Sequence, residues 1–149
     1  GTCGVGVNLY KKHNEWLPNY RLAAGCVVMN PKTDHILLLR RSIHETSRVG
    51  LWELPGGKVE ANETPEQTAI NETIEEAGPD LGPMVWMGQE LEPHIDANME
   101  KIYYAYLVEA PNPKVVLSDE HDAFMWITVE GALTIQPLSH HAHFMLSQL

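Results

Sequence analysis

The stretch LPGGKVEANETPEQTAINETIEEAGP, residues 54–79, decides the fold because it carries a full set of helix start and stop signals. Together these signals predict a helix of about three and a half turns over residues 65–77. The signals are the N-cap Thr64, Pro65 at the first helical position, Gln67 in a capping box, Gly78 after the last turn and the helix-stopping Pro79.

This helix is expected to separate an apolar stripe from an acidic face. The stripe predicted to be buried comprises Ile70, Thr73, Ile74 and Ala77. The opposite face carries Glu72, Glu75 and Glu76, and the helix contains no basic residue to offset their repulsion. Most charge runs are solvated surfaces, but that reading leaves the preceding Gly-Gly loop unexplained. Carboxylates at these spacings converge, which favours a site for a hard cation such as Mg²⁺.

The spacing of these residues resembles the Nudix box, G-x5-E-x7-R-E-U-x-E-E-x-G-U, in which U is a bulky apolar residue. Asn71 stands where the family has Arg, and Thr73 and Pro79 stand where it has apolar residues. The preceding residues 50–56, GLWELPG, resemble the MutT-like branch. The matching positions are Gly57, Glu63, Glu72, Glu75, Glu76 and Gly78.

The resemblance implies a hydrolase that cleaves a nucleoside diphosphate linked to another moiety, with Mg²⁺ as cofactor and Mn²⁺ as the alternative. It implies that the metal ligands are Glu72, Glu75, Glu76 and the backbone carbonyl of Gly56. Either Glu72 or Glu75 is then a candidate base. Glu120, with Asp119 as the alternative, is a candidate for a further catalytic carboxylate from a loop, as in some family members.

Four more residues are candidates for substrate contacts. Arg40, Arg41 and Lys58 are cations near the glycine loop, and adjacent strand residues point to opposite faces, so we expect only one arginine near the site. A solvated strand end is the alternative for each cation. Trp52 is a candidate for stacking on a base, with a place in the core or at its rim as the alternative.

Histidines and cysteines give weaker signals. His140, His141 and His143 fan out around a helix, so we expect surface histidines there and no metal site. Cys26 lies in an apolar run and is expected to be buried and inert.

Composition sets the broad class. The chain has 149 residues, which we expect to form one domain over residues 1–149. Its net charge of −10 disfavours binding of a nucleic acid polymer, but bound metal would allow a small nucleotide as partner. The two cysteines do not have the spacing of metal ligands, and the sequence contains no long apolar run. These features predict a cytoplasmic protein with no membrane partner. The sequence leaves a homodimer open.

Residue patterns typical of β-strands occur both before and after this helix in the sequence. With a second helix at the C-terminus, they predict an α/β (α+β) fold, and the resemblance implies the Nudix-type α/β/α sandwich with a central mixed β-sheet. The expected strands cover residues 5–9, 21–30, 35–41, 52–54, 84–92, 101–108 and 123–127, with a turn at 96–98. The expected C-terminal helix follows the cap Ser139 and buries Ala142, Met145, Leu146 and Leu149.

Three functions follow from this interpretation. The first is a MutT-like nucleoside triphosphate pyrophosphohydrolase, including one for oxidised nucleotides. Residues 137–140 lack the asparagine with which MutT-like enzymes often read guanine, which weighs against an oxidised guanine substrate. The second is an ADP-ribose or nucleotide-sugar pyrophosphatase, for which Pro93 is weak support. The third, suggested by Asn71, is a catalytically weak module that binds a nucleotide and regulates another process.

Overall fold

The computed structural model describes residues 19–78, 80–93 and 99–149. Its centre is a mixed sheet in the order β3-β2-β1-β6-β5, with β4 paired to β1 and β7 paired to β2. The strands are β1 (Asn19–Met29), β2 (Ile36–Arg41), β3 (Trp52–Glu53), β4 (Gly56–Lys58), β5 (Met84–Pro93), β6 (Met99–Glu109) and β7 (His121–Ile127). The helices are α2 (Pro65–Ala77), α3 (Val129–Ala132) and α4 (His140–Leu146).

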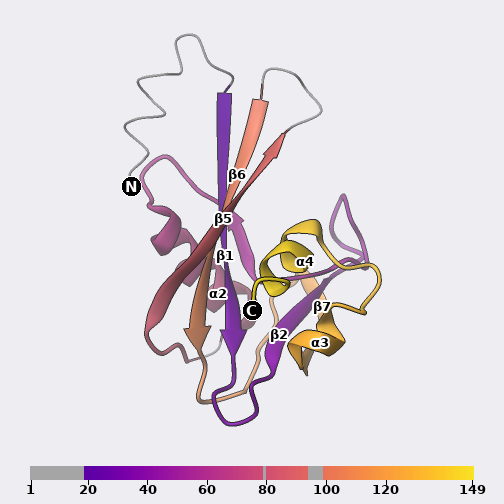
Figure 1. The fold of residues 1–149 in the computed structure, drawn as a ribbon. Helices are drawn as coiled ribbons and strands as arrows, with labels where there is room; N and C mark the ends of the chain where they lie inside the picture. Colours follow the sequence, from indigo (N-terminus) through magenta and orange to yellow (C-terminus); the bar gives the residue numbers. More distant parts are fainter. Residues whose placement is uncertain (1–18, 79, 94–98) are drawn as a thin grey trace.

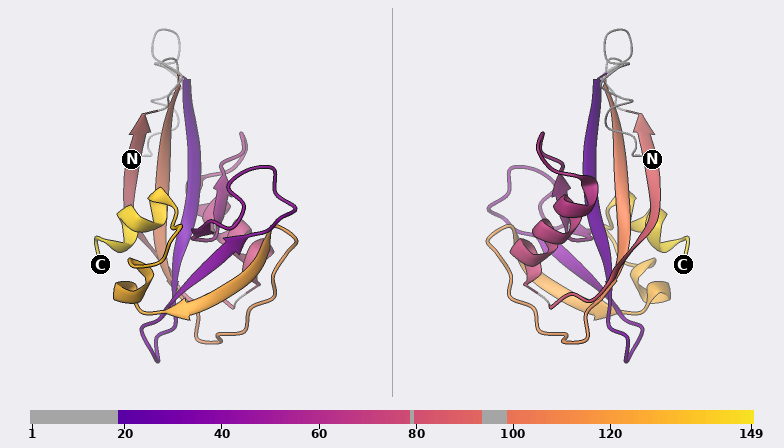
Figure 2. Two further views of the ribbon diagram at one scale, coloured as in Figure 1. Left: turned by 90° about the vertical axis from the view of Figure 1, so that its right-hand side faces the viewer. Right: turned by 90° about the vertical axis from the view of Figure 1, so that its left-hand side faces the viewer.

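Helices cover both faces of the sheet, which confirms the predicted sandwich (Figures 1 and 2). Alternate residues of β1 face the two layers, as the period of a strand requires. Cys26 belongs to the core shared with Ala69 of α2. Val27 belongs to the core shared with Met145 and Leu146 of α4.

Helix α2 begins and ends as predicted, but its buried face differs from the prediction. Thr64 and Gln67 form the capping box, and Gly78 adopts a left-handed φ of 64°. Ile74 is 52% exposed, while Glu76 is only 2% exposed. Thr73 and Ala77 of the predicted stripe are buried, but the assignment of Ile74 to the stripe was wrong, because α2 packs closely on the sheet through small side chains. The buried residues are Thr68, Ala69, Thr73, Glu76 and Ala77.

Strand β1 positions the glycine loop. It pairs antiparallel with β4, which places Gly56 opposite Gly25 and Gly57 opposite Ala24. On its other side β1 pairs in parallel with β6. A Cβ on Gly56 would lie 2.5 Å from the carbonyl oxygen of Ala24, so only glycine lets the two backbones approach this closely.

The predicted strands within the described residues are confirmed, with ends that differ by one or two residues. Strand β4 and helix α3 were not predicted. Leu149 is 51% exposed, so its assignment to the buried stripe of the last helix was wrong. The predictions for residues 5–9, Pro79 and residues 96–98 lie outside the described part of the chain. None of the described helices has the length and apolar character to cross a membrane.

Candidate active site

Glu76 is the most deeply placed acidic residue of the site. Its side chain faces the sheet beneath the glycine loop, and its Oε1 accepts a hydrogen bond from the backbone N–H of Gly56 at 3.2 Å. Across residues 19–78, 80–93 and 99–149, no cation forms an ion pair with Glu76. A buried carboxylate with one backbone donor and no counterion is costly to keep ionised.

Glu72 lies one helical turn before Glu76 and packs against the glycine loop. A Cβ on Gly57 would lie 2.6 Å from Oε1 of Glu72, so this carboxylate sits directly over the glycine. Glu75 is exposed at the outer side of the same helix. The helix therefore presents Glu72 and Glu76 toward the loop and leaves Glu75 at the rim.

Burial, together with the crowding of acidic groups, raises the pKa values of Glu72 and Glu76. Burial is the main cause for Glu72, and its contact with Glu75 adds to it, so that the pKa rises to about 7. Burial also dominates for Glu76, whose pKa rises to about 9 even though the Gly56 N–H lowers it; Glu120, Glu72 and Glu53 raise it further. Without a compensating cation, both groups therefore keep their protons to a higher pH than an ordinary carboxyl group.

These raised pKa values predict how metal-free stability depends on pH. A carboxyl group with a raised pKa in the folded state binds protons there more tightly than in the unfolded chain, so stability falls as pH rises. For Glu76 this loss of stability takes place between pH 4.5, the ordinary pKa, and about pH 9, the pKa in the folded protein. In EDTA, Glu76→Gln should therefore gain free energy of unfolding relative to wild type between about pH 5 and about pH 8.

Urea unfolding of both proteins across this pH range measures the difference. Glu66→Gln is the matched control because Glu66 is exposed on the same helix. If the free energies of unfolding of wild type and Glu76→Gln changed with pH in parallel, the prediction would be contradicted.

A divalent cation fits this set of donors. Glu72 and Glu76 supply carboxylate oxygens at a place where negative charge lacks a counterion, and oxygen ligands are what Mg²⁺ and Mn²⁺ prefer. No three Asp, Glu, His or Cys side chains among the described residues already surround a common point as ligands would. The side chains therefore supply the right chemistry, and a metal would have to draw them together.

A further carboxylate, Glu53, is held beside this group by two donors. Nε2 of His121 lies 2.8 Å from Oε2 of Glu53, and Nη1 of Arg41 lies 3.4 Å from the same oxygen. Arg41 also pairs with Glu45 at 2.9 Å. The His121 side chain is 1% exposed, and within the described chain its Nδ1 has no hydrogen-bond partner. A neutral ring protonated at Nε2 satisfies Glu53 and leaves no buried N–H unpaired.

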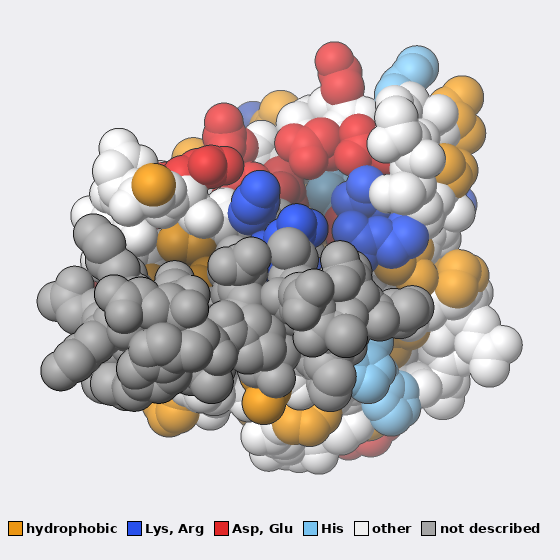
Figure 3. All heavy atoms as spheres, turned by 90° about the horizontal axis from the view of Figure 1, so that it is seen from above, with side chains coloured by type: hydrophobic (Ala, Val, Ile, Leu, Met, Phe, Trp, Pro, Cys, Tyr) orange, Lys and Arg blue, Asp and Glu red, His pale blue; other side chains and the backbone are white. Residues whose placement is uncertain are grey.

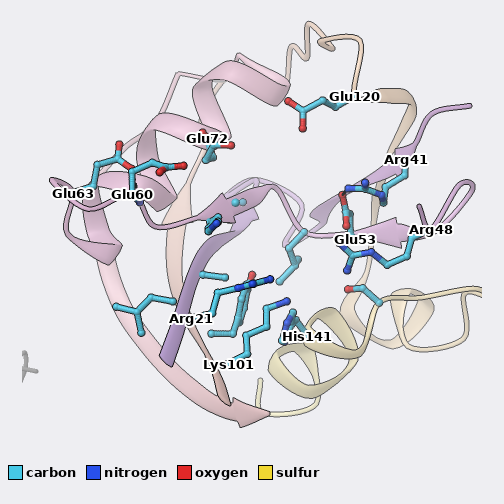
Figure 4. Close-up of a pocket in the computed structure, with 18 residues that line it drawn as sticks. Arg21, Arg41, Arg48, Glu53, Glu60, Glu63, Glu72, Lys101, Glu120 and His141 are labelled. Carbon is cyan, nitrogen blue, oxygen red and sulfur yellow. Dashed lines mark hydrogen bonds and ion pairs between the residues drawn. The ribbon is translucent and has the colours of Figure 1, made fainter. Parts of the chain in front are cut away.

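Glu53, Glu72 and Arg41 line a cavity of about 510 Å³ (Figure 4). Carboxylates and cations meet around it at the protein surface (Figure 3). Of the candidate site residues, the cavity is lined by Gly56, Glu72, Arg41, Lys58 and Glu120. Glu76 and Glu75 are not in its lining, although both affect the pKa of Glu72: Glu75 raises it, and a hydrogen bond with Glu76 lowers it. Asp119, the alternative to Glu120, also lies outside the lining.

Arg40 and Trp52 lie outside the cavity lining as well. Arg40 pairs with Asp122 at 2.8 Å, and its guanidinium lies 5.7 Å from the centre of the Trp52 ring. Only one of the two neighbouring arginines, Arg41, reaches the cavity, which matches the expected alternation. We therefore do not retain Arg40 and Trp52 as substrate contacts.

Glu63 joins the loop after β4 to α2. It accepts hydrogen bonds from the Thr68 hydroxyl at 2.9 Å and from the Asn71 amide at 3.4 Å. The Thr68 bond is the main cause of its lowered pKa, followed by the Glu60 N–H. Asn71, which replaces the family's arginine, therefore contacts Glu63 rather than Glu72 or Glu76.

The expectation of surface histidines was wrong for His141. Its side chain is 14% exposed, lines the cavity, and places Nδ1 2.8 Å from the buried carboxylate of Glu90. Its ring stacks on Tyr103 with centroids 4.2 Å apart. His140 is exposed, as expected, and pairs with the same Glu90. Cys26 is buried, as predicted, and burial raises the pKa of its thiol to about 11, which disfavours the reactive thiolate.

Comparison with known proteins gives a consistent result. The family model described as NUDIX domain matches residues 19–146. The chain is 31% identical over 101 residues to CTP pyrophosphohydrolase of Escherichia coli K12, covering 67% of this chain and 72% of that protein. It is 34% identical over 107 residues to bis(5′-nucleosyl)-tetraphosphatase (asymmetrical) of Sus scrofa, covering 68% of this chain and 72% of that protein. In three further curated relatives the match spans only 27 to 29% of the whole protein.

Solved structures agree with the family match. The MutT NUDIX hydrolase of Burkholderia pseudomallei is similar with a TM-score of 0.73 and 26% sequence identity. The alignment covers 88% of this chain and 98% of that one.

Proposed function

Because the chain belongs to the Nudix family, we propose that it is a metal-dependent hydrolase that cleaves a nucleoside diphosphate linked to another moiety. The observation that carries the proposal is the pair Glu72 and Glu76, held without a counterion against the glycine loop at the edge of a nucleotide-sized cavity. The proposed substrate class is a nucleoside triphosphate, cleaved as a pyrophosphohydrolase. The names of the E. coli and pig relatives support a nucleotide substrate.

Mg²⁺ is the proposed cofactor, with Mn²⁺ as the alternative. Nudix hydrolases generally use divalent metals, and here Glu72, Glu76 and the Gly56 carbonyl would hold the ion, with Glu75 at the rim as a further ligand. A bound metal neutralises phosphate oxygens and lowers the pKa of water.

The remaining residues position the substrate and handle protons. Glu120 extends from the loop before β7 to the cavity, where a carboxylate can accept a proton from an attacking water. Arg41, fixed by Glu45 and Glu53, offers a guanidinium to phosphate oxygens. Lys58 is exposed on the cavity wall and supplies a more mobile positive charge.

A panel of nucleotides tests the proposal. Nucleoside triphosphates, oxidised nucleotides, ADP-ribose and nucleotide sugars are each incubated with Mg²⁺, and released phosphate or pyrophosphate is measured. We expect turnover of at least one triphosphate, which EDTA abolishes. Tight binding of one nucleotide without turnover of any would support a regulatory binding module and overturn the enzymatic proposal.

Replacement of Asn71 by Arg should lower the Mg²⁺ concentration needed for half-maximal rate. Asn71 already donates to Glu63, and a guanidinium there would add charge and a second hydrogen bond. It would also bring a positive charge onto the acidic helix and so help the carboxylates to ionise. Mg²⁺ titrations of the rate for wild type and Asn71→Arg measure the change. An unchanged or higher Mg²⁺ requirement would show that another group already fills this role.

A further inference from the structure

Three neighbouring strands bring His121, Arg41 and Glu53 together. Strand β2 pairs with β3 on one side and with β7 on the other, and Arg41 of β2 lies opposite His121 of β7. The register of β2 and β7 shifts between Arg40 and Arg41, which leaves Asp122 out of the pairing. An irregularity of this kind re-aims the side chains beside it. Asp122 binds Arg40 outside the cavity, and His121 comes to lie beside Arg41.

Core packing alone does not explain a histidine at position 121. The ring lies outside the cavity lining with its side chain 1% exposed, and within the described chain Nδ1 has no hydrogen-bond partner. A buried polar atom without a partner costs free energy that an apolar side chain of similar size would avoid. What the histidine gives in return is the 2.8 Å hydrogen bond from Nε2 to Oε2 of Glu53.

The guanidinium of Arg41 is fixed through each of its three nitrogens. Nε donates to the backbone carbonyl of Ser47 at 3.1 Å, Nη2 donates to Glu45 at 2.9 Å, and Nη1 donates to Glu53 at 3.4 Å. An arginine has five N–H groups, so within the described residues two remain, one on each terminal nitrogen. Such a pair of N–H groups suits two oxygens of one phosphate.

Orientation, rather than excess positive charge, is what distinguishes Arg41. Its side chain is 13% exposed and is paired with two carboxylates, so its donors point in set directions before a ligand arrives, which lowers the cost of binding. Figure 4 shows Arg41 and Glu53 side by side on the cavity wall. The Glu53 contact is the longest of the three, and Glu53 is itself held more closely by His121. The aim of the guanidinium on this side therefore depends on His121.

We propose that His121 is a positioning residue for Arg41. It fixes Glu53, and Glu53 together with Glu45 orients the guanidinium so that its two remaining N–H groups bind a phosphate of the substrate. The proposal rests on the proposed function, since this phosphate belongs to the nucleotide in the same cavity. His121 itself touches no substrate, because it lies outside the cavity lining.

Two substitutions of His121 should rank in opposite order for activity and for stability. His121→Gln keeps an N–H donor near the position of Nε2, whereas His121→Leu has no donor. We expect His121→Leu to raise KM about tenfold, the size of one charge-assisted hydrogen bond, and to change kcat less than about threefold. His121→Gln should keep most of the affinity. His121→Leu should nevertheless melt at the higher temperature, because it buries no unpartnered polar atom. A role in packing alone predicts the same order for both properties.

A double-mutant cycle tests whether His121 acts through Glu53. Glu53→Ala should raise KM at least as much as His121→Leu does, and adding His121→Leu to Glu53→Ala should change KM little further. Effects on KM that simply multiply in the double variant would overturn the inference. His143→Gln is the matched control and should keep the wild-type KM, because His143 is exposed on α4 and lies outside the cavity lining.

Binding separates failure of the inference from failure of the proposed function. ATP, CTP, GTP and UTP are each tested with Mg²⁺, and the one that wild type binds most tightly is used for all variants. If it is bound but not hydrolysed, its dissociation constant from calorimetry replaces KM. Weaker binding in His121→Leu, retained in His121→Gln, then means that the inference stands although the proposed function fails. Turnover with an unchanged KM in His121→Leu overturns the inference alone, and the absence of any binding overturns both.

Discussion

Glu76→Gln is expected to lower kcat/KM with Mg²⁺ by at least about a hundredfold, because it removes a charged oxygen ligand from the centre of the site. Even residues that only orient metal ligands are commonly worth about 10–100-fold. The fold should persist, because glutamine has the same shape and its amide oxygen can still accept the hydrogen bond of the Gly56 N–H. Glu72→Gln should act similarly, since Glu72 lies over Gly57 in the same loop.

The rate with saturating nucleotide and a titration of Mg²⁺ measure this effect, and thermal unfolding in EDTA checks the fold. Glu66→Gln again serves as control because it removes one exposed charge from the same helix. Turnover of Glu76→Gln close to that of wild type would remove Glu76 from the metal site. A comparable loss in Glu66→Gln would point to the overall charge of the helix instead.

The fold was predictable where local chemistry determines it. The caps of α2 depend on Thr64, Gln67 and Gly78, whose preferences act within a few residues, and the helix begins and ends where they predict. The buried face of α2 was not predictable in the same way. Helical periodicity assigned both Thr73 and Ile74 to the core, but close packing on the sheet buries Glu76 and leaves Ile74 exposed.

The site was predictable where its residues share one segment of chain. Glu72, Glu76 and Gly56 belong to a single motif, and the structure brings them together. Arg21 and Lys101 also line the cavity but were missed, because only the parallel pairing of β1 with β6 makes them neighbours, and no local pattern specifies that pairing. His141 was missed for a similar reason: its partner Glu90 lies on a distant strand.

One polar residue of strand β5 did give a sequence signal for the position of His141. Glu90 is an acidic residue within the alternating run of β5, and a buried acid usually needs a partner. A search for that partner among the histidines of the last helix would have found His140 and His141 as candidates. The sequence alone could not rank them, because it does not show which face of α4 meets β5.

Gly57→Ala is expected to reduce activity about as strongly as the loss of Glu72, while it leaves stability almost unchanged. A Cβ at position 57 would lie 2.6 Å from Oε1 of Glu72 and 2.9 Å from its Cγ and Cδ. These atoms belong to a flexible side chain, so Glu72 can rotate away at a small cost in stability. The rotation removes its carboxylate from the loop, and misplacement by about 1 Å costs about a hundredfold in rate.

The neighbouring glycine makes this prediction specific. A Cβ on Gly56 would meet backbone atoms, at 2.5 Å from the Ala24 oxygen and 2.7 Å from Cα of Gly25, so Gly56→Ala should lower the melting temperature as well as the activity. Gly88→Ala is the control for a glycine in a strand, because its nearest contact would be an ordinary 3.7 Å from Gln148. Melting temperatures and kcat/KM for the three variants then separate the two effects. A Gly57→Ala enzyme with full activity would show that Glu72 acts from a position other than the one over the glycine loop.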